Sequence, residues 1–528
     1  MTAILGTDGK PLQREQLSAR PRNRINAHYD GAQTSTANAN YWASADSLSA
    51  RAAHSPAVRK VIRERARYEV GNNCYAKGML RTQADYVIGT GPRLQLLTED
   101  KEFNRGVTRL FYEWAESVQF ARKLWTMRFA WGVDGEAFAE FVNNDRSEHP
   151  VTLDLMLLET DQISDGYGEW NLDQRREDGV ILDKFGNIVG YRKLPYHPGD
   201  QTWWTYTREP EVLQKRDVIH LYRLERPGQL RGVSEIAPAL MLYPGLRRWT
   251  YAALSTAEKN ARIYGVIKSN YSPADIIAAG NMTWSDFRAD SAAPQAMDAF
   301  ELEADTLLTM PDGWDMNAYK SEQPSTTYPM FKREIVSEMA RCLNMPFGIA
   351  AADSSTYNFA SGKLDLMPWG KSIAIDQLQV SEVAATPVFR RWYYEARRIP
   401  GYLPFGPPES AAQGEYVPPH IWQWDGQRAI DPREAMSKAT LVEYGLSNFA
   451  REYAERGYDV DEEHEAQSKS LGMTVDEYRA ALRMKLFGVD PLAPAPQPEA
   501  APMSARDRLA AMLANDRTEQ EVEDALAS

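Results

Sequence analysis

The chain has 528 residues, of which 43% are hydrophobic and 25% are charged. At about 150 residues per domain, this length predicts roughly three to four structural units, and the apolar content excludes a chain that is disordered throughout. The formal net charge of −13 argues against a protein whose outer surface grips duplex phosphates through a broad basic patch.

Cysteine and histidine are scarce. Two cysteines, Cys74 and Cys342, and seven histidines without paired ligand spacing predict neither a disulfide framework nor a metal site, so we expect a reducing compartment. No run of about 18 apolar residues occurs, and the N-terminal residues lack the basic start and apolar core of a secretory signal. We therefore expect neither a membrane span nor export.

The first half of the chain predicts a mixture of helices and strands. Residues 1–53 lack aliphatic periodicity, which predicts an arm that packs on another surface through Tyr29, Tyr41 and Trp42. Ser55 followed by Pro56 predicts a helix start. Further along we expect two short strand pieces within 86–97 broken at Gly89 and Gly91, a helix with its apolar face over 103–114, and strands at 136–142, 151–158, 180–194 (a hairpin) and 218–223.

The second half is mainly helical in pattern. We expect a long helix over 234–264, a polar segment to 325 with short strands near Val266 and Leu307, and a second helix over 328–343. The longest helical pattern covers 364–398, where Pro368 and Pro387 each predict a kink or a break. Short helices follow over 431–487, with capping boxes that begin at Asp431 and Thr474, and then a Pro/Ala linker over 490–502 and an acidic tail helix over 504–526.

Motifs of common enzyme classes are missing from the sequence. Gly370-Lys371-Ser372 has Asp365 where a phosphate loop needs glycine, and Gly89-Thr90-Gly91 has Leu94 where a dinucleotide fingerprint needs its third glycine. His464-Glu465 is followed by Ser468 instead of a second histidine. No group of carboxylates stands among small and aromatic residues as a buried acid–base pair would, so the residues alone predict no active site and no cofactor.

Three stretches of the sequence resemble the lambda-type bacteriophage portal proteins, the head-to-tail connectors. They are YDGAQTS...NYWASADS followed by RKVIRERARYEVGNNCYAKGMLRTQADYVIGTGPRLQ, then HLYRLERPGQLRGVSEIAPALMLYPGLRRWTYAALSTAEKNA, and finally NMPFGIAAADSSTYNFASGKLDL. They occur in the order expected of the family, and none is a catalytic signature. The resemblance implies an α+β, predominantly helical portal fold.

The same resemblance divides the chain into parts. It implies an N-terminal arm (1–54), an α/β wing (55–233), a stem helix (234–262), a clip (263–325), a second stem helix (326–346), a tunnel loop (347–363), a long wing helix with its connection (364–428), a helical crown (429–487), and a linker with a C-terminal tail (488–528).

The implied function is a ring of about twelve copies at one capsid vertex. Terminase would drive double-stranded DNA through the ring during packaging, and the DNA would leave by the same channel on ejection. The implied partners are other copies of the chain, double-stranded DNA, the terminase large subunit, the major capsid and scaffold proteins, and a head-completion adaptor protein. The implied location is the virion, after assembly in the host cytoplasm, and the resemblance implies no enzymatic activity.

The implied site residues fall into three sets. Those of the tunnel loop are Ser354, Ser355, Tyr357, Asn358 and Lys363; those of the stem are Arg247, Arg248, Lys259, Arg262, Lys332 and Arg333; and those of the clip, facing terminase, are Asp275, Asp286, Asp290 and Asp298. A channel through which DNA slides must not hold phosphates strongly, because each neutralised phosphate adds sequence-independent affinity. Short uncharged side chains and few cations at the narrowest point are consistent with that requirement, as is the acidic net charge.

A second interpretation comes from a different class of protein. The chain could be a soluble cytoplasmic hydrolase with an unrecognised site, for example one that uses Asp353 and Ser355 in the same loop. Mass distinguishes the two, because a ring of about twelve would have a mass near about 700 kDa whereas an enzyme of this size is commonly a monomer or dimer.

Overall fold

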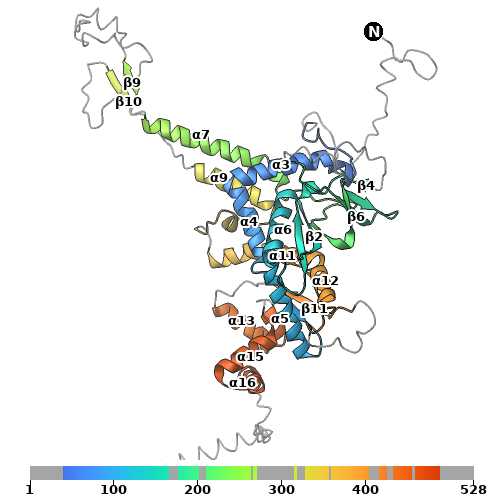
Figure 1. Cartoon of the computed structure of the whole chain (residues 1–528). Helices are drawn as coiled ribbons and strands as arrows, with labels where there is room; N and C mark the ends of the chain where they lie inside the picture. Colours follow the sequence, from blue (N-terminus) through green and yellow to red (C-terminus); the bar gives the residue numbers. More distant parts are fainter. Residues whose placement is uncertain are drawn as a thin grey trace, which may run out of the picture.

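The computed structural model describes residues 40–165, 176–200, 210–262, 266–269, 314–317, 327–355, 358–403, 416–424, 432–454 and 458–487. These residues form an elongated molecule around a central body (Figure 1). The long helix α7 (Leu242–Arg262) projects from the body toward the hairpin of β9 (Val266–Ser269) and β10 (Trp314–Asn317), and α9 (Thr327–Arg341) packs beside α7. At the opposite end lie α13 (Pro432–Glu443), α14 (Phe449–Ala454), α15 (Val460–Leu471) and α16 (Val475–Phe487).

Four helices form one side of the body. They follow the short helix α2 (Ala50–Ala53) and are α3 (Pro56–Asn72), α4 (Cys74–Ile88), α5 (Lys101–Ser117) and α6 (Phe120–Asp134). Ser55 and Pro56 start α3 as expected, and the Asn73 side chain caps α4 by accepting hydrogen bonds from the amides of Tyr75 (2.9 Å) and Ala76 (3.3 Å). Helix α6 was not expected, because it buries side chains on several faces, Arg128 among them, and so lacks an amphipathic period.

The strands form small antiparallel sheets. The three-stranded sheet has the order β3 (Leu153–Leu158), β2 (Glu136–Asn143), β8 (Val218–Tyr222), and Phe138 of its central strand faces Leu158 on one side and His220 on the other. The four-stranded sheet is β4 (Arg176–Glu177), β5 (Val180–Leu182), β6 (Ile188–Lys193) and β7 (Glu211–Gln214), and short helices η2 (Thr160–Gln162) and η4 (Lys215–Asp217) flank these sheets. The expected strands at 136–142, 151–158 and 218–223 and the 180–194 hairpin are confirmed within one or two residues.

An aromatic cluster joins segments that are distant in sequence. The ring of Phe111 on α5 lies 5.6 Å from that of Phe389 and 5.2 Å from that of Trp392, both on α12 (Thr386–Ala396), and 5.9 Å from that of Trp422 on β11 (His420–Gln423). Strand β11 pairs with β1 (Arg93–Leu96). Truncation of one such buried ring costs about 3–5 kcal/mol in typical cores, so this cluster fixes β11 against α5 and α12.

Three sequence expectations are corrected by the structure. Tyr86–Ile88 belong to α4, and Gly89, at φ 54°, ends that helix, so only the second strand piece of 86–97 exists. The long helix expected from 234 begins at Leu242, after a 3-10 turn, η5 (Ala237–Ala239), which has Pro238 in its first turn. The helix expected from 364 already begins at Phe359.

The long helical pattern is interrupted at one place. Helix α11 (Phe359–Val380) continues through Pro368 and passes into a π-helical turn, η6 (Ser381–Ala385), before α12 begins. Pro387 lies in the first turn of α12, where its missing N–H is tolerated. Of the two expected interruptions, the structure therefore has the one at Pro387.

The C-terminal helices pack against the end of the body through charged contacts. Arg105 of α5 pairs with Glu465 of α15, and Lys101 lies 3.3 Å from Asp461. The capping box at Thr474 is confirmed, because its amide donates to Glu477 (2.8 Å) and its hydroxyl accepts from the Glu477 amide (3.3 Å). The capping box at Asp431, the strand near Leu307, the linker over 490–502 and the tail helix lie outside the described residues.

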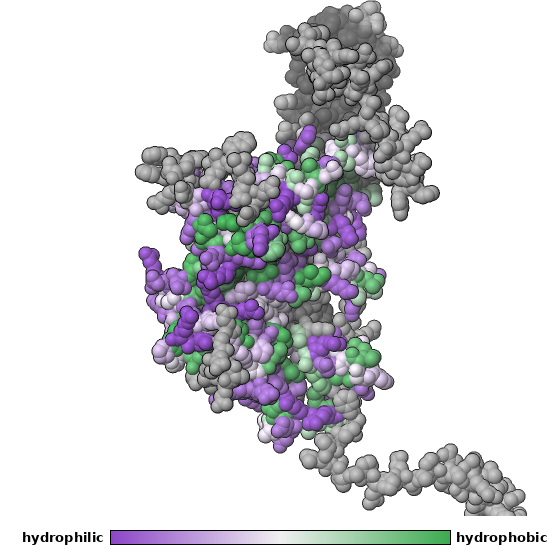
Figure 2. Space-filling view, turned by 90° about the vertical axis from the view of Figure 1, so that its right-hand side faces the viewer, coloured by the Kyte–Doolittle hydropathy of each residue, from purple (hydrophilic) through white to green (hydrophobic). Residues whose placement is uncertain are grey.

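Hydrophobic side chains also reach the surface. Figure 2 shows them on one side of the molecule in several patches between hydrophilic groups. Tyr41 and Trp42, the two arm aromatics within the described residues, are 76% and 50% exposed. No helix among the described residues is long and apolar enough to cross a membrane.

Candidate functional site

The polar loop between α10 (Phe347–Ala350) and α11 is the expected tunnel loop. Its first turn is fixed by the backbone: Ala352 has a φ of 52°, and the Asp353 amide donates to the Gly348 carbonyl at 3.0 Å. The Asp353 carboxylate accepts a hydrogen bond from the Ser355 amide at 3.0 Å, and its hydrogen bonds with Ser355 hold the pKa of Asp353 below its ordinary value. Ser354 and Ser355 are exposed and can offer their hydroxyls to a passing ligand.

The loop is shorter than the expected range 347–363. Asn358 caps α11: its Oδ1 accepts from the Ser361 amide (2.8 Å) while Ser361 Oγ accepts from the Asn358 amide (3.2 Å). This reciprocal pair satisfies two helix N-terminal donors. Lys363 is exposed in the first turns of α11, and Tyr357 lies outside the described residues. Asn358 and Lys363 are therefore held by a helix rather than by a mobile loop.

The expected stem cations have different surroundings. Arg247 of α7 forms a two-pronged ion pair with Glu69 of α3, at 2.8 and 3.1 Å. Arg248, the next residue, is exposed. Helix α7 also carries Lys259 and Arg262, whose side chains lie outside the described part of the structure.

The two stem cations on α9 lie against aromatic rings. The Lys332 ammonium is 5.4 Å from the centre of the Tyr75 ring, and the Arg333 guanidinium is 4.8 Å from that of Phe347. Both side chains are partly buried, so they contribute to packing within the chain. The clip residues Asp275, Asp286, Asp290 and Asp298 fall outside the described residues.

A buried ionic group connects β2, β8 and α3. We call it the Glu136 cluster, and it consists of Glu136, His220, Arg231, Arg59 and Asp178. Glu136 is fully buried at the start of β2. It accepts hydrogen bonds from Arg231 Nε (2.8 Å) and from the Gly232 amide (3.0 Å), and it lies 3.0 Å from His220 Nε2. Arg59 of α3 pairs with Asp178 and lies 3.5 Å from Glu136. Strand, loop and helix therefore meet at one carboxylate.

The electrostatics of the Glu136 cluster keep the carboxylate charged. Burial raises the pKa of Glu136, but the charge of Arg231 and the hydrogen bonds from Arg231 and His220 outweigh burial and hold that pKa well below its ordinary value. Burial lowers the pKa of His220, and the hydrogen bond to Glu136 offsets this only in part. A neutral His220 with its proton on Nε2 donates to Glu136 and accepts at Nδ1 from the Tyr191 hydroxyl, at 3.2 Å.

A second buried group, the Asp376 cluster, holds α11: Asp376, Arg128, Glu235, Arg223 and Gln83. Asp376 and Arg128 are each 1% exposed. Arg128 Nη2 donates to Asp376 at 2.9 Å and its Nη1 donates to Glu235 at 3.0 Å, while Arg223 donates to Asp376 at 2.5 Å. Gln83 of α4 donates to Asp376 (3.4 Å) and accepts from the indole of Trp369 on α11 (3.1 Å).

Two glycines let the loop after β8 cross the start of β2. A Cβ on Gly232 would stand 2.0 Å from the Gly135 carbonyl oxygen, and one on Gly135, whose φ is +92°, would stand 2.3 Å from the Val233 carbonyl carbon. No larger residue fits this backbone contact. The crossing places Arg231 and Glu235, on either side of Gly232, in the two ion clusters.

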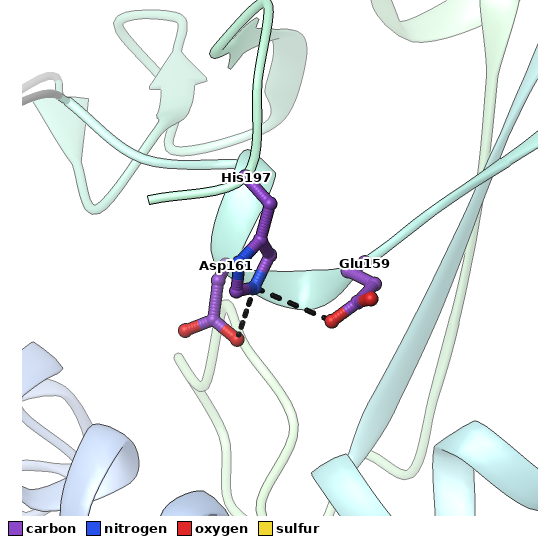
Figure 3. A group of neighbouring side chains, drawn as sticks. All are labelled: Glu159, Asp161 and His197. Atoms are coloured by element: carbon purple, nitrogen blue, oxygen red, sulfur yellow. Dashed lines mark ion pairs between the residues drawn. The ribbon is translucent and has the colours of Figure 1, made fainter. Parts of the chain in front are cut away.

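One further group of side chains has the composition of a metal site. Glu159, Asp161 and His197 bring one potential ligand atom each to within 4.8 Å of one another (Figure 3). Arg63 (2.5 Å) and Arg67 (2.8 Å) already donate to Asp161, and His197 Nε2 lies 3.3 Å from Glu159 and 3.4 Å from Asp161. Two guanidinium charges oppose a divalent cation here, so ion pairing alone accounts for the group.

Sequence spacing did not reveal these two ion clusters. They bury Glu136 and Asp376 with partners up to 293 residues away in the chain, and no spacing rule detects such partners. The group of Glu159, Asp161 and His197 escaped notice for the same reason. The available signal was the concentration of His220, Arg223, Arg231 and Glu235 in the single stretch HLYRLERPGQLRGVSE.

Known proteins are similar to this chain over most of its length. A family model described as "Phage portal protein, lambda family" matches residues 36–375, more than half of the chain. The chain belongs to this family. Portal protein B of Escherichia phage lambda is 22% identical to the chain over 432 residues, which cover 74% of this chain and 80% of that protein. The resemblance stated from the sequence is thereby confirmed.

Chains of solved structures are also similar. One comes from the virion of a native gene transfer agent particle, with 15% identity, a TM-score of 0.42, and coverage of 73% of this chain and 89% of that chain. Another comes from the neck of the native particle computed with C12 symmetry, with 13% identity, a TM-score of 0.37, and coverage of 75% and 91%.

Within this phage portal protein, the stretch 220–235 has a physical role. It contributes to both ion clusters and makes the glycine crossing. The Asp376 cluster attaches α11, and with it the end of the polar loop before α11, to α4, α6 and the stretch 220–235. Both clusters are structural parts of the portal, and the polar loop and stem helices remain the candidates for contact with DNA.

Proposed function

We propose that about twelve copies of this phage portal protein form a closed ring at one capsid vertex, and that double-stranded DNA passes through its channel during packaging and ejection. The observation that carries the proposal is the match to the lambda portal family over 36–375. The elongated shape supports it, because the α7–α9 pair and the C-terminal helices extend from opposite ends of the body, as a stem and a crown would.

The channel is proposed to contact DNA through Ser354, Ser355 and Tyr357 of the loop and Asn358 and Lys363 at the start of α11. Hydroxyl and amide groups exchange hydrogen bonds with phosphates and water at little net free-energy change, so they allow DNA to slide. Several stem cations are engaged within the chain, Arg247 with Glu69 and Arg333 with Phe347. The few remaining exposed cations, such as Arg248, would limit the grip on phosphates.

The clip is proposed to meet the terminase large subunit. Asp275, Asp286, Asp290 and Asp298 make this segment acidic, and acidic groups steer a basic partner surface and hasten its docking. Replacement of Asp286, Asp290 and Asp298 with Asn should slow association with terminase and flatten its salt dependence, while assembly of the ring persists. Unchanged association kinetics in stopped-flow experiments would remove the clip acids from this role.

The other proposed partners follow from the same assignment. The wing would contact the major capsid and scaffold proteins, and a head-completion adaptor would bind after packaging. The portal would be made in the host cytoplasm and retained in the virion.

We also propose that the chain catalyses no reaction of its own. In the alternative hydrolase, Asp353 would act as a base toward Ser355. Its carboxylate accepts the Ser355 amide and has a lowered pKa, which makes it a weaker base, and no histidine of the described residues forms a hydrogen bond with either side chain.

Mass and shape test the ring. For a chain of 59.7 kDa, mass photometry should find a species of about 700 kDa. Electron micrographs should show rings with a central hole. A solution that contains only monomers or dimers at micromolar concentration would overturn the proposal.

A further inference from the structure

Helix α11 carries two apolar faces, and the described residues of the chain cover only one of them. The covered face contains Trp369, Ile373 and Val380, all buried, together with Asp376 of the ion cluster. On the opposite side, four large apolar side chains are more than half exposed: Leu364 (67%), Met367 (61%), Ile375 (63%) and Leu378 (58%). Their spacing of three, eight and three residues places them along one line of the helix. We call this line the α11 stripe.

The α11 stripe requires a partner. A helix that is apolar on both faces belongs in a protein interior, and an exposed row of large apolar side chains marks a contact surface. Lys371 lies in the middle of the stripe and is exposed, and among the described residues no carboxylate pairs with it. The missing partner surface should therefore be apolar and carry a carboxylate near its centre.

The outer face of α9 has this composition. Met330 is 60% exposed and Phe331 is 48% exposed at one end of the face. Glu334 and Glu338 follow at four-residue spacing and are exposed, without an ion-pair partner in the described part of the chain. Apolar residues and a charge of the opposite sign therefore occur on α9 in a row of nine residues, which can cover part of the fifteen-residue α11 stripe.

A two-fold contact would bury both surfaces in one interface only if they formed a single self-complementary patch. A head-to-tail contact buries one of each per subunit and closes into a ring when the rotation permits. We propose that the α11 stripe of one protomer packs on the outer face of α9 of the next, with Lys371 opposite Glu334 or Glu338. This proposal rests on the proposed ring and names the surfaces that form it.

Cysteine cross-linking tests the contact directly. In a C74S background, which removes the exposed native thiol, one protein carries Ile375→Cys and a second, of different tag size, carries Met330→Cys. After coassembly, bismaleimide treatment should yield dimers that contain both tags. Each protein alone, in which the partly buried Cys342 is the other thiol, should give at least about tenfold less dimer, since equivalent helices do not meet. A matched control is Arg109→Cys, at an exposed position of α5, in place of Met330→Cys.

The outcomes separate the two proposals. If rings form by mass photometry but no mixed dimer appears, the pairing of α11 with α9 is wrong while the ring stands. Dimers of Ile375→Cys with itself would indicate contact between equivalent stripes and would also overturn the pairing. If the C74S protein forms no ring, the proposed function itself fails.

Charge reversal provides a second measurement. Lys371→Glu should raise the concentration needed for assembly by about tenfold, because it places like charges opposite one another. Glu334→Lys with Glu338→Lys should act in the same direction, and the triple variant should regain most of the loss. Circular dichroism should show the same helix content in all variants. Failure of the triple variant to recover assembly would exclude pairing of these charges.

Discussion

Glu136 shows how one buried residue can organise a domain. It accepts hydrogen bonds from Arg231 and the Gly232 amide and contacts His220. Burying a charge is costly, and only a full set of partners compensates for the lost hydration. Removal of one member of the Glu136 cluster should therefore lower the free energy of unfolding, whereas replacement of all its members by apolar residues of similar size need not.

Glu136→Gln should lower the free energy of unfolding by about 3–5 kcal/mol, because it leaves the buried guanidinium of Arg231 with only Asp178, at 3.5 Å, as counter-charge. Urea unfolding at fixed protein concentration, followed by tryptophan fluorescence, measures the change. Glu113→Gln is the control: its side chain is 56% exposed in an ion pair with Arg109, so it should change stability by less than about 0.5 kcal/mol. Equal effects of the two substitutions would contradict the role of the cluster.

His220 predicts a pH dependence. Burial lowers its pKa in the folded chain below the ordinary 6.5, whereas the unfolded chain keeps the ordinary value. Below pH 6.5 the unfolded state therefore binds more protons at this site, so acidification should favour unfolding.

The measurement is the free energy of unfolding between pH 7.5 and 5.5. It should fall toward acid with a contribution from His220 of at most about 1.4 kcal/mol per pH unit. His220→Gln should reduce this slope. A variant with the slope of the unchanged protein would show that His220 does not titrate differently in the two states.

At the scale of elements, α11 is held by a charge rather than by packing alone. Asp376 receives hydrogen bonds from Arg128 of α6, Arg223 after β8 and Gln83 of α4. Asn358 caps the start of α11. The position of the polar loop before α11 therefore depends on Asp376, about five helical turns away. Helix α11 thus connects the Asp376 cluster to the end of the polar loop.

Asp376→Ala should destabilise the chain by about 3–5 kcal/mol, since Arg128 keeps only Glu235 as counter-charge. It should also accelerate amide hydrogen exchange in peptides that cover 364–380, because α11 loses its anchor. Asp365→Ala, at an exposed position of the same helix, is the matched control and should leave exchange unchanged. If exchange in α11 stays at its original rate in Asp376→Ala, aromatic packing alone holds the helix.

At the scale of the whole molecule, the chain is extended and exposes apolar groups at several separate places. Tyr41 and Trp42 before α2 and Met436 and Tyr444 on and after α13 are all at least half exposed. An isolated soluble monomer rarely exposes so many large apolar side chains. Contacts between copies would bury them, in addition to the α11 stripe.

Deletion of residues 1–50 should therefore weaken the ring. The deleted segment carries Tyr41 and Trp42, which are 76% and 50% exposed, so its removal should reduce contacts between subunits and leave the central body folded. Light scattering should detect a shift from the ring to smaller species. An unchanged ring would place the arm outside the interface.

The sequence alone determined the parts of the fold that depend on local pattern. Ser55-Pro56 starts α3, short runs of strand-favouring residues predict β2 and β8, and the turn at 183–187 predicts the hairpin of β5 and β6, because capping, strand preference and turn chemistry act between near neighbours. The portal resemblance likewise depended on the linear order of three stretches, and the family match over 36–375 confirms it.

Tertiary structure decided what depends on distant partners. Helix α6 lacks a regular apolar stripe because it buries side chains on several faces, and the carboxylates of Glu136 and Asp376 are buried because Arg231 and Arg128 reach them across the fold. A sequence pattern records neither event, since the cost of burying a charge and the ion pair that offsets it come from segments joined only on folding. The same physics leaves the α11 stripe exposed in one chain: the charge and the tryptophan on its inner face attach the helix, and its outer face is free to meet another copy.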